Sequence, residues 1–119
     1  MHYQLYYNPK CSTCQKTKRL LAESGLEPQL IYYLDEGVSP EEVVTLSKKL
    51  GMHPKEFIRE KDLGQFDIEN TEYSVEEWSE IISENPAILQ RPILVSDDVA
   101  IVARPPEKAL EMLNFIAKG

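Results

Sequence analysis

Short apolar runs alternate with amphipathic stretches along the first third of the chain. Residues 3–7 are rich in aromatic and aliphatic side chains of high strand propensity, and Asn8 with the proline after it ends this extended run. Residues 11–25 follow with apolar positions at helical spacing, and residues 30–34 form a near-continuous apolar run. The pattern predicts a βαβ unit in which two parallel strands, the second buried on both faces, are joined by a right-handed crossover.

The middle of the chain, from residue 34 to residue 91, shows no convincing strand pattern. Ser39 and Ser74 are each followed three positions later by glutamate, which is the signature of a capping box at the start of a helix. Pro54 begins a further short helix, because proline is favoured at the first helical position. We therefore predict a helical insertion at about residues 38–88.

Two apolar runs return near the end of the chain, at residues 92–95 and 99–102. They flank a polar turn and predict an antiparallel hairpin, and an amphipathic helix follows from Pro105. A chain of 119 residues is long enough for one hydrophobic core and needs no second. We expect a single α/β domain over residues 1–119.

The charge balance limits the partners that this chain can have. It carries 13 Lys and Arg against 20 Asp and Glu, a net charge of −7, which disfavours direct nucleic-acid binding because that requires a cationic face. No apolar run approaches the roughly 18 residues of a membrane span, and no signal-peptide pattern is present, so we expect a cytoplasmic protein with no membrane association. The exception to the acidic balance is a group of four cations near the two cysteines: Lys10, Lys16, Lys18 and Arg19.

The two cysteines lie where the first strand turns into the first helix. Cys11 falls at the helix N-terminus, where unpaired N–H groups and the helix dipole favour a thiolate, so we expect it to be a nucleophile. Cys14 lies on nearly the same helix face, at about 5–6 Å, which a disulfide can span, so it is a candidate resolving thiol. The alternatives are two small buried apolar residues or half of a zinc site. We expect no metal, because His2 and His53 offer no paired spacing for further ligands.

Three arginines stand at the boundaries of predicted elements. Arg91 precedes the third strand, Arg104 follows the fourth, and Arg59 ends the short helix of the insertion. In a layered α/β protein these boundaries can share the sheet edge that carries the cysteine turn. Three guanidinium groups there would lower the pKa of a thiol and grip a tetrahedral oxyanion, although each arginine alone is also consistent with a surface charge or a structural ion pair.

Four segments together carry a family resemblance over nearly the whole chain. These are Tyr-x-Asn-Pro-x-Cys at 6–11, the Arg59 segment, Arg91 with the Pro-Ile that follows it, and Arg104 with the Pro-Pro-Glu-Lys that follows it. The combination resembles the glutaredoxin-coupled arsenate reductases of the thioredoxin-like fold. The resemblance implies a four-stranded mixed sheet with a helical insertion between the second and third strands, and a cis peptide before Pro92.

The same resemblance implies a reaction and its partners. Cys11 would attack arsenate, and Asn8, Arg59, Arg91 and Arg104 would bind this oxyanion. Glutathione would be the thiol co-substrate that resolves the adduct, glutaredoxin would regenerate the enzyme, and no cofactor would be bound.

Two positions depart from this pattern and leave alternatives open. Tyr7 stands where some arsenate reductases carry histidine, and Cys14 stands where they carry serine. Cys-x-x-Cys at this place resembles the Spx group of redox-sensing regulators that bind RNA polymerase, whereas Arg104 and its two prolines favour the reductases. The rival hypotheses are therefore a dithiol oxidoreductase of another substrate and a Spx-like transcriptional regulator.

Overall fold

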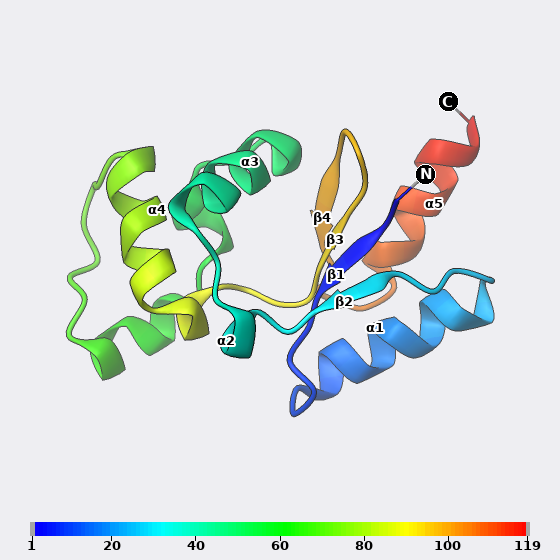
Figure 1. Cartoon of the computed structure of the whole chain (residues 1–119), viewed down its shortest axis with the longest axis horizontal. Helices are drawn as coiled ribbons and strands as arrows, with labels where there is room; N and C mark the ends of the chain where they lie inside the picture. The colour runs from blue at the N-terminus through cyan, green and yellow to red at the C-terminus, as the bar shows by residue number, and fades with distance from the viewer. Residues whose placement is uncertain (1, 119) are drawn as a thin grey trace.

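The computed structural model describes residues 2–118, with side chains to residue 113, and its centre is a four-stranded mixed sheet. The strands are β1 (Gln4–Tyr6), β2 (Gln29–Ile31), β3 (Ile93–Val95) and β4 (Ala100–Val102), in the order β2-β1-β3-β4. Strand β1 pairs in parallel with β2 and antiparallel with β3, which pairs antiparallel with β4. This α/β architecture, with its helical segment between the second and third strands, is the predicted one (Figure 1).

The register of the sheet brings four strand ends to one edge. Tyr6, the last residue of β1, pairs with Ile31 on one side and with Ile93 on the other. Ile93 in turn pairs with Val102, the last residue of β4. The C-terminal ends of β1, β2 and β4 therefore lie beside the start of β3, and this common edge, expected from the sequence for β1, β3 and β4, is where the cysteine turn follows.

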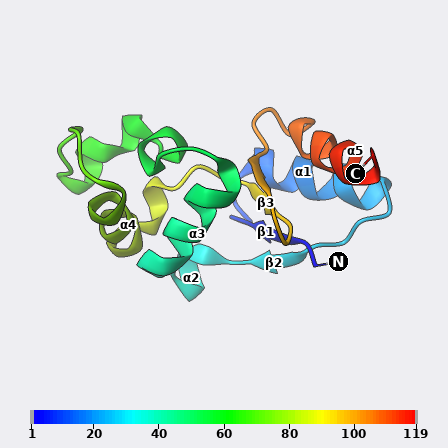
Figure 2. The same cartoon turned by 90° about the horizontal axis from the view of Figure 1, so that it is seen from above.

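Side chains alternate between the two faces of the sheet, as strand geometry requires. Leu5 and Leu94 point to one face, where they pack under α1 (Ser12–Glu23) and α5 (Lys108–Lys118). Figure 2 shows these two helices side by side along that face. Tyr6, Ile93 and Val95 point to the other face and pack with the helical segment. Strand β3 is therefore buried on both faces.

The helical segment between β2 and β3 is built from short helices with well-formed N-termini. Both predicted capping boxes are present: Ser39 Oγ accepts from the Glu42 backbone at 3.1 Å, and Ser74 Oγ accepts from the Glu77 backbone at 3.1 Å. Helices α3 and α4 pack against each other around the fully buried Trp78. In chain order the elements are α2 (Tyr33–Glu36), α3 (Pro40–Leu50), η1 (Pro54–Phe57), η2 (Glu60–Phe66), α4 (Val75–Glu84) and η3 (Pro86–Ile88).

One predicted strand is partly wrong. The apolar run at 30–34 was expected to be a strand buried on both faces, but β2 ends at Ile31, lies at the edge of the sheet and is only partly buried. Helix α2 begins at Tyr33 instead, and the Glu36 carboxylate accepts from the Tyr32 backbone N–H at 2.9 Å, which closes its single turn. The run is apolar because Tyr33 is fully buried in the core beside the sheet, whereas Leu34 is 43% exposed.

Two prolines flank the β3–β4 hairpin, and both follow cis peptide bonds. The Arg91–Pro92 bond is cis, as the family resemblance implied, and Arg104–Pro105 is cis as well, which the sequence had not indicated. The Ala103 backbone N–H donates to the Pro92 carbonyl at 3.0 Å. The backbone segments that carry the two arginines are therefore held side by side at the shared edge.

Candidate functional site

A tight turn between β1 and α1 positions the first cysteine. Asn8 closes it twice: its carbonyl oxygen accepts from the Cys11 N–H at 3.0 Å, and its side-chain Oδ1 accepts from the Lys10 N–H at 3.0 Å. Cys11 is the N-cap residue of α1, with extended backbone angles, and its carbonyl accepts the first helical bond from Gln15 at 3.1 Å. The Cys11 thiol thus faces the unpaired N–H groups of the first helical turn, as predicted.

The groups around Cys11 make its thiol acidic. Partial burial by itself raises the pKa, but the polar groups that face the sulfur outweigh it. They are the backbone N–H groups of Cys14 and Thr13, the thiol of Cys14 and the guanidinium of Arg91. Together these lower the pKa of Cys11 to about 7. A large fraction of Cys11 is therefore thiolate at neutral pH, which is the form that acts as a nucleophile.

The pKa of Cys14 is shifted in the opposite direction, so its thiol is a much weaker acid than that of Cys11. Its side chain is fully buried, and burial raises its pKa to about 12, although the backbone N–H of Asn8 acts in the other direction. The neighbouring Cys11 and its negative charge contribute to this rise. Both cysteines are free thiols in this structure. Cys14 therefore remains protonated beside the Cys11 sulfur.

Of the three arginines predicted to bind the oxyanion, Arg91 is the one that acts directly on the Cys11 thiol. Its guanidinium lowers the pKa of the Cys11 thiol, and its Nη1 donates to the Ala87 carbonyl at 3.2 Å. Arg104 is exposed, and its Nη1 donates to the backbone carbonyl of Arg91 at 2.8 Å. Arg91 and Arg104 therefore lie at the same site. Arg91 acts on the Cys11 thiol, and Arg104 lies at the exposed edge.

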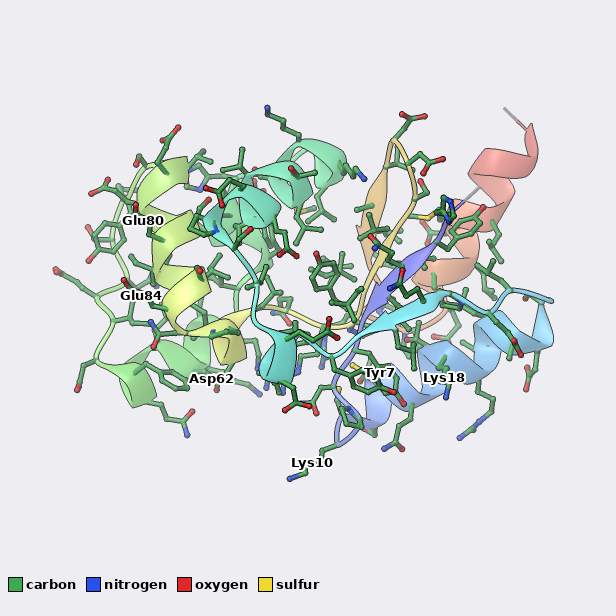
Figure 3. The ribbon with its side chains drawn as sticks, in the orientation of Figure 1. Tyr7, Lys10, Lys18, Asp62, Glu80 and Glu84 are labelled. Carbon is green, nitrogen blue, oxygen red and sulfur yellow. The ribbon has the colours of Figure 1, made fainter. Side chains whose placement is uncertain are left out.

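Arg59 reaches the site through the helical segment. An isolated bridge between Ile58 and Leu89, with a 2.6 Å bond from the Arg59 backbone N–H to the Ile88 carbonyl, fixes this segment beside the approach to β3. The Arg59 Nε donates to Asp62 Oδ2 at 2.6 Å, and this bond lowers the pKa of the Asp62 carboxyl. Figure 3 shows Asp62 along the same lower edge of the molecule as the residues of the cysteine turn. Arg59 is thus oriented by its ion pair with Asp62.

The cationic group near the cysteines is directed elsewhere. Lys10 points away from the body of the molecule, and the Nζ of Lys18 lies 5.9 Å from the centre of the Tyr7 ring (Figure 3). Lys16 forms an exposed ion pair with Glu107 at 3.5 Å. The predicted local positive charge therefore comes to Cys11 from Arg91 rather than from the lysines.

Sequence reasoning missed Tyr33 as a residue of this site. Its side chain is fully buried, and the charges of Arg91, Arg59 and both cysteines act on its hydroxyl. It sits two positions after the end of β2, at the sheet edge that carries the cysteine turn. Its place just after a strand could have indicated a residue of the site. The apolar residues around it predicted a strand instead, so Tyr33 was assigned to the core.

The described residues form neither a metal site nor a membrane span. Within residues 2–118 no three His, Cys, Asp or Glu side chains gather as a metal site would need. Over the same described residues, every helix is too short or too polar to cross a membrane.

Comparison with known proteins identifies similar chains. A model of the ArsC family matches residues 6–112. An arsenate reductase of Haemophilus influenzae is 36% identical over 112 residues, covering 92% of this chain and 97% of the relative. The solved structure of an arsenate reductase from Vibrio cholerae is 33% identical with a TM-score of 0.82, covering 93% of this chain and 97% of that one. A putative arsenate reductase from Yersinia pestis is 28% identical with a TM-score of 0.85, covering 92% and 98%.

Proposed function

Because this chain belongs to the ArsC family and resembles proteins named as arsenate reductases, we propose that it is a thiol-dependent arsenate reductase in which Cys11 is the nucleophile. The observation that carries the proposal is the acidic thiol of Cys11 at the start of α1, with a pKa of about 7 that the guanidinium of Arg91 helps to lower. A thiolate beside a fixed cation is the arrangement that attack on an oxyanion requires.

The reaction begins at the Cys11 sulfur. The thiolate attacks the arsenic atom of arsenate, an arsenic–sulfur bond forms, and one oxygen leaves as water. Arg91 and Arg104, with Arg59 from the helical segment, neutralise the oxyanion and hold its oxygens through planar N–H groups. Asn8 closes the turn before Cys11 through its Oδ1, which accepts from the Lys10 N–H, and its side-chain NH2 group donates to an oxygen of the oxyanion.

Two further thiols complete the reduction. Glutathione resolves the adduct and glutaredoxin regenerates the free Cys11 thiol, with no cofactor bound to the chain. Over the cycle, two thiols become one disulfide, and their two electrons reduce arsenic from +5 to +3 as arsenite is released. These donors place the reaction in a reducing compartment such as the cytoplasm.

One observation favours a second candidate, a dithiol mechanism. The Cys14 thiol faces the Cys11 sulfur, and part of its raised pKa comes from the charge on Cys11. Once Cys11 is bonded to arsenic, that charge is gone and Cys14 becomes easier to ionise. Its attack on Cys11 would then release arsenite and leave a Cys11–Cys14 disulfide, without glutathione.

Activity assays on two cysteine variants test the proposal. Arsenate-dependent NADPH oxidation is measured with glutathione, glutathione reductase and glutaredoxin, and arsenite release in a single turnover of the reduced enzyme is measured with no thiol added. We expect Cys11→Ser to be inactive and Cys14→Ser to keep most of its activity, which makes it the matched control for loss of a thiol. Turnover by the wild type that needs neither glutathione nor glutaredoxin, and is lost in Cys14→Ser, would instead support the dithiol mechanism.

Two results would contradict the enzyme proposal altogether. The first is full activity of Cys11→Ser. The second is an absence of arsenate-dependent turnover with every thiol donor, together with oxidation that changes affinity for RNA polymerase, which would favour the Spx-like alternative.

A further inference from the structure

Two buried polar atoms at the site have no hydrogen-bond partner. They are the hydroxyl of Tyr33 and the Nε of Arg91. Well over nine tenths of buried polar groups in native proteins are paired, and leaving one unpaired costs stability. Among the side chains of residues 2–113, the other two such atoms belong to Trp78 and Gln90. Two unpaired atoms next to one nucleophile indicate a place that a ligand fills.

The fold holds Tyr33 firmly beside the nucleophile. Helix α2 leaves the end of β2 and turns the Tyr33 ring inward, where it lies 6.3 Å from the Tyr6 ring at the end of β1. The side chain has no exposed surface. The charges of Cys11 and Arg91 both act on its hydroxyl, so the three groups share one local environment.

The Tyr33 hydroxyl can act only as a hydrogen-bond donor or acceptor at working pH. Burial raises its pKa to about 12, although the positive charge of Arg91 opposes this change. The phenol is therefore neutral and protonated when Cys11 is a thiolate, and it cannot serve as a base. An O–H without a protein partner in such a place is suited to an anionic oxygen.

We propose that Tyr33 is a substrate-contacting residue whose hydroxyl donates a hydrogen bond to one oxygen of the tetrahedral oxyanion attacked by Cys11, while Arg91 Nε donates to another. The inference rests on the proposed function and adds a neutral donor to its arginines. The bound oxyanion then satisfies both unpaired groups at once. The neighbouring Tyr6 shows the structural alternative, because its hydroxyl donates to the Glu42 carboxylate at 2.9 Å.

Tyr6 supplies a matched control for the test. Tyr6→Phe and Tyr33→Phe remove the same atom from neighbouring buried rings, but only Tyr33 lacks a partner. Each substitution is made in a Cys11→Ser background, so that arsenate binds without reacting, and the dissociation constant is measured by calorimetry. Loss of a hydrogen bond to a charged oxygen should weaken arsenate binding about ten- to a hundredfold in Tyr33→Phe. Binding by Tyr6→Phe should match that of the Cys11→Ser parent.

Thermal unfolding without arsenate separates a binding role from a structural one. Tyr33→Phe should unfold at or above the temperature of its parent, because the lost hydroxyl had no partner. Tyr6→Phe should unfold at a lower temperature, because it loses the bond to Glu42. Unchanged arsenate affinity in Tyr33→Phe, or weaker affinity together with a lowered unfolding temperature, overturns the inference. If the Cys11→Ser parent binds no arsenate, the oxyanion site of the proposed function fails as well.

Discussion

Cys11 and Cys14 are separated by two residues and share a helix, yet their surroundings give them opposite acid strengths. Cys11 is the N-cap and faces the N–H groups of the first turn of α1, whereas Cys14 is sealed between α1 and the sheet. Position relative to the helix start and to the core thus assigns one sulfur to the thiolate form and the other to the thiol form.

Alkylation across pH tests this difference at the residue scale. Iodoacetamide reacts with the thiolate, so labelling of Cys11 should rise as pH increases through about 7, where its proton is lost. Cys14 should stay unlabelled in the folded protein throughout the neutral range, because its pKa is raised to about 12 and it is buried. Peptide mass spectrometry after timed labelling gives the rate at each site. Equal rates at the two cysteines would contradict the assignment.

Arg91→Lys identifies the source of the low pKa. A lysine ammonium cannot reproduce the planar guanidinium contact, so the midpoint for Cys11 labelling should move to higher pH. Arg19→Lys is the control, because Arg19 is exposed on α1 and makes the same chemical change away from the sulfur. A midpoint that stays at its wild-type value in Arg91→Lys would show that backbone N–H groups alone set the pKa.

At the scale of elements, the helical segment depends on its caps more than on helix length. Helix α4 spans only Val75–Glu84, too short to be stable alone, and its first turn is closed by reciprocal bonds between Ser74 and Glu77. Packing of Trp78 against the rest of the core then holds the helix in place. A local signal of this kind fixes where a helix begins, and packing then stabilises a helix that is too short to form alone.

Ser74→Ala should lower the free energy of unfolding by about 1 kcal/mol, because the Glu77 N–H loses its acceptor. Urea denaturation followed by circular dichroism measures the change. Glu80→Ala is the control on the same helix, since Figure 3 shows Glu80 pointing away from the body of the molecule, and it should change stability by less than about 0.5 kcal/mol. Equal stability of wild type and Ser74→Ala would mean that the capping box contributes nothing.

At the scale of the whole molecule, two apolar clusters meet on the sheet. One contains Trp78 and lies between the sheet and the helical segment, and the other contains Cys14 and lies under α1 and α5. Strand β3 belongs to both, because Ile93 packs into the first and Leu94 into the second. Loss of either cluster exposes the strand that supports the other, so we expect them to unfold together.

Two probes, one in each cluster, test this cooperativity. Trp78 is the single tryptophan of the chain, and in a Cys11→Ser variant Cys14 is the single thiol. Urea unfolding of that variant is followed by fluorescence of Trp78 and by a brief pulse of thiol reagent that labels Cys14. The two midpoints should coincide. Separate midpoints would show that the helical segment and the sheet unfold independently.

The sequence alone determined the features that depend on neighbouring residues. The Ser39 and Ser74 capping boxes and the cysteine at a helix start are all local, and each appears where it was predicted. The family resemblance added the mixed sheet and the cis bond before Pro92. The roles of Cys11 and the arginines in catalysis stay predictions for the assays above.

Only the tertiary structure decided features that depend on residues far apart in the chain. The apolar run at 30–34 could not reveal that β2 stops at an edge while Tyr33 turns into the core, because burial depends on what packs against a residue and not on the residue itself. The buried, unpaired hydroxyl of Tyr33 likewise appears only when the helical segment closes on the sheet. The sequence therefore indicated the nucleophile, and the packing of distant segments decided which groups surround it.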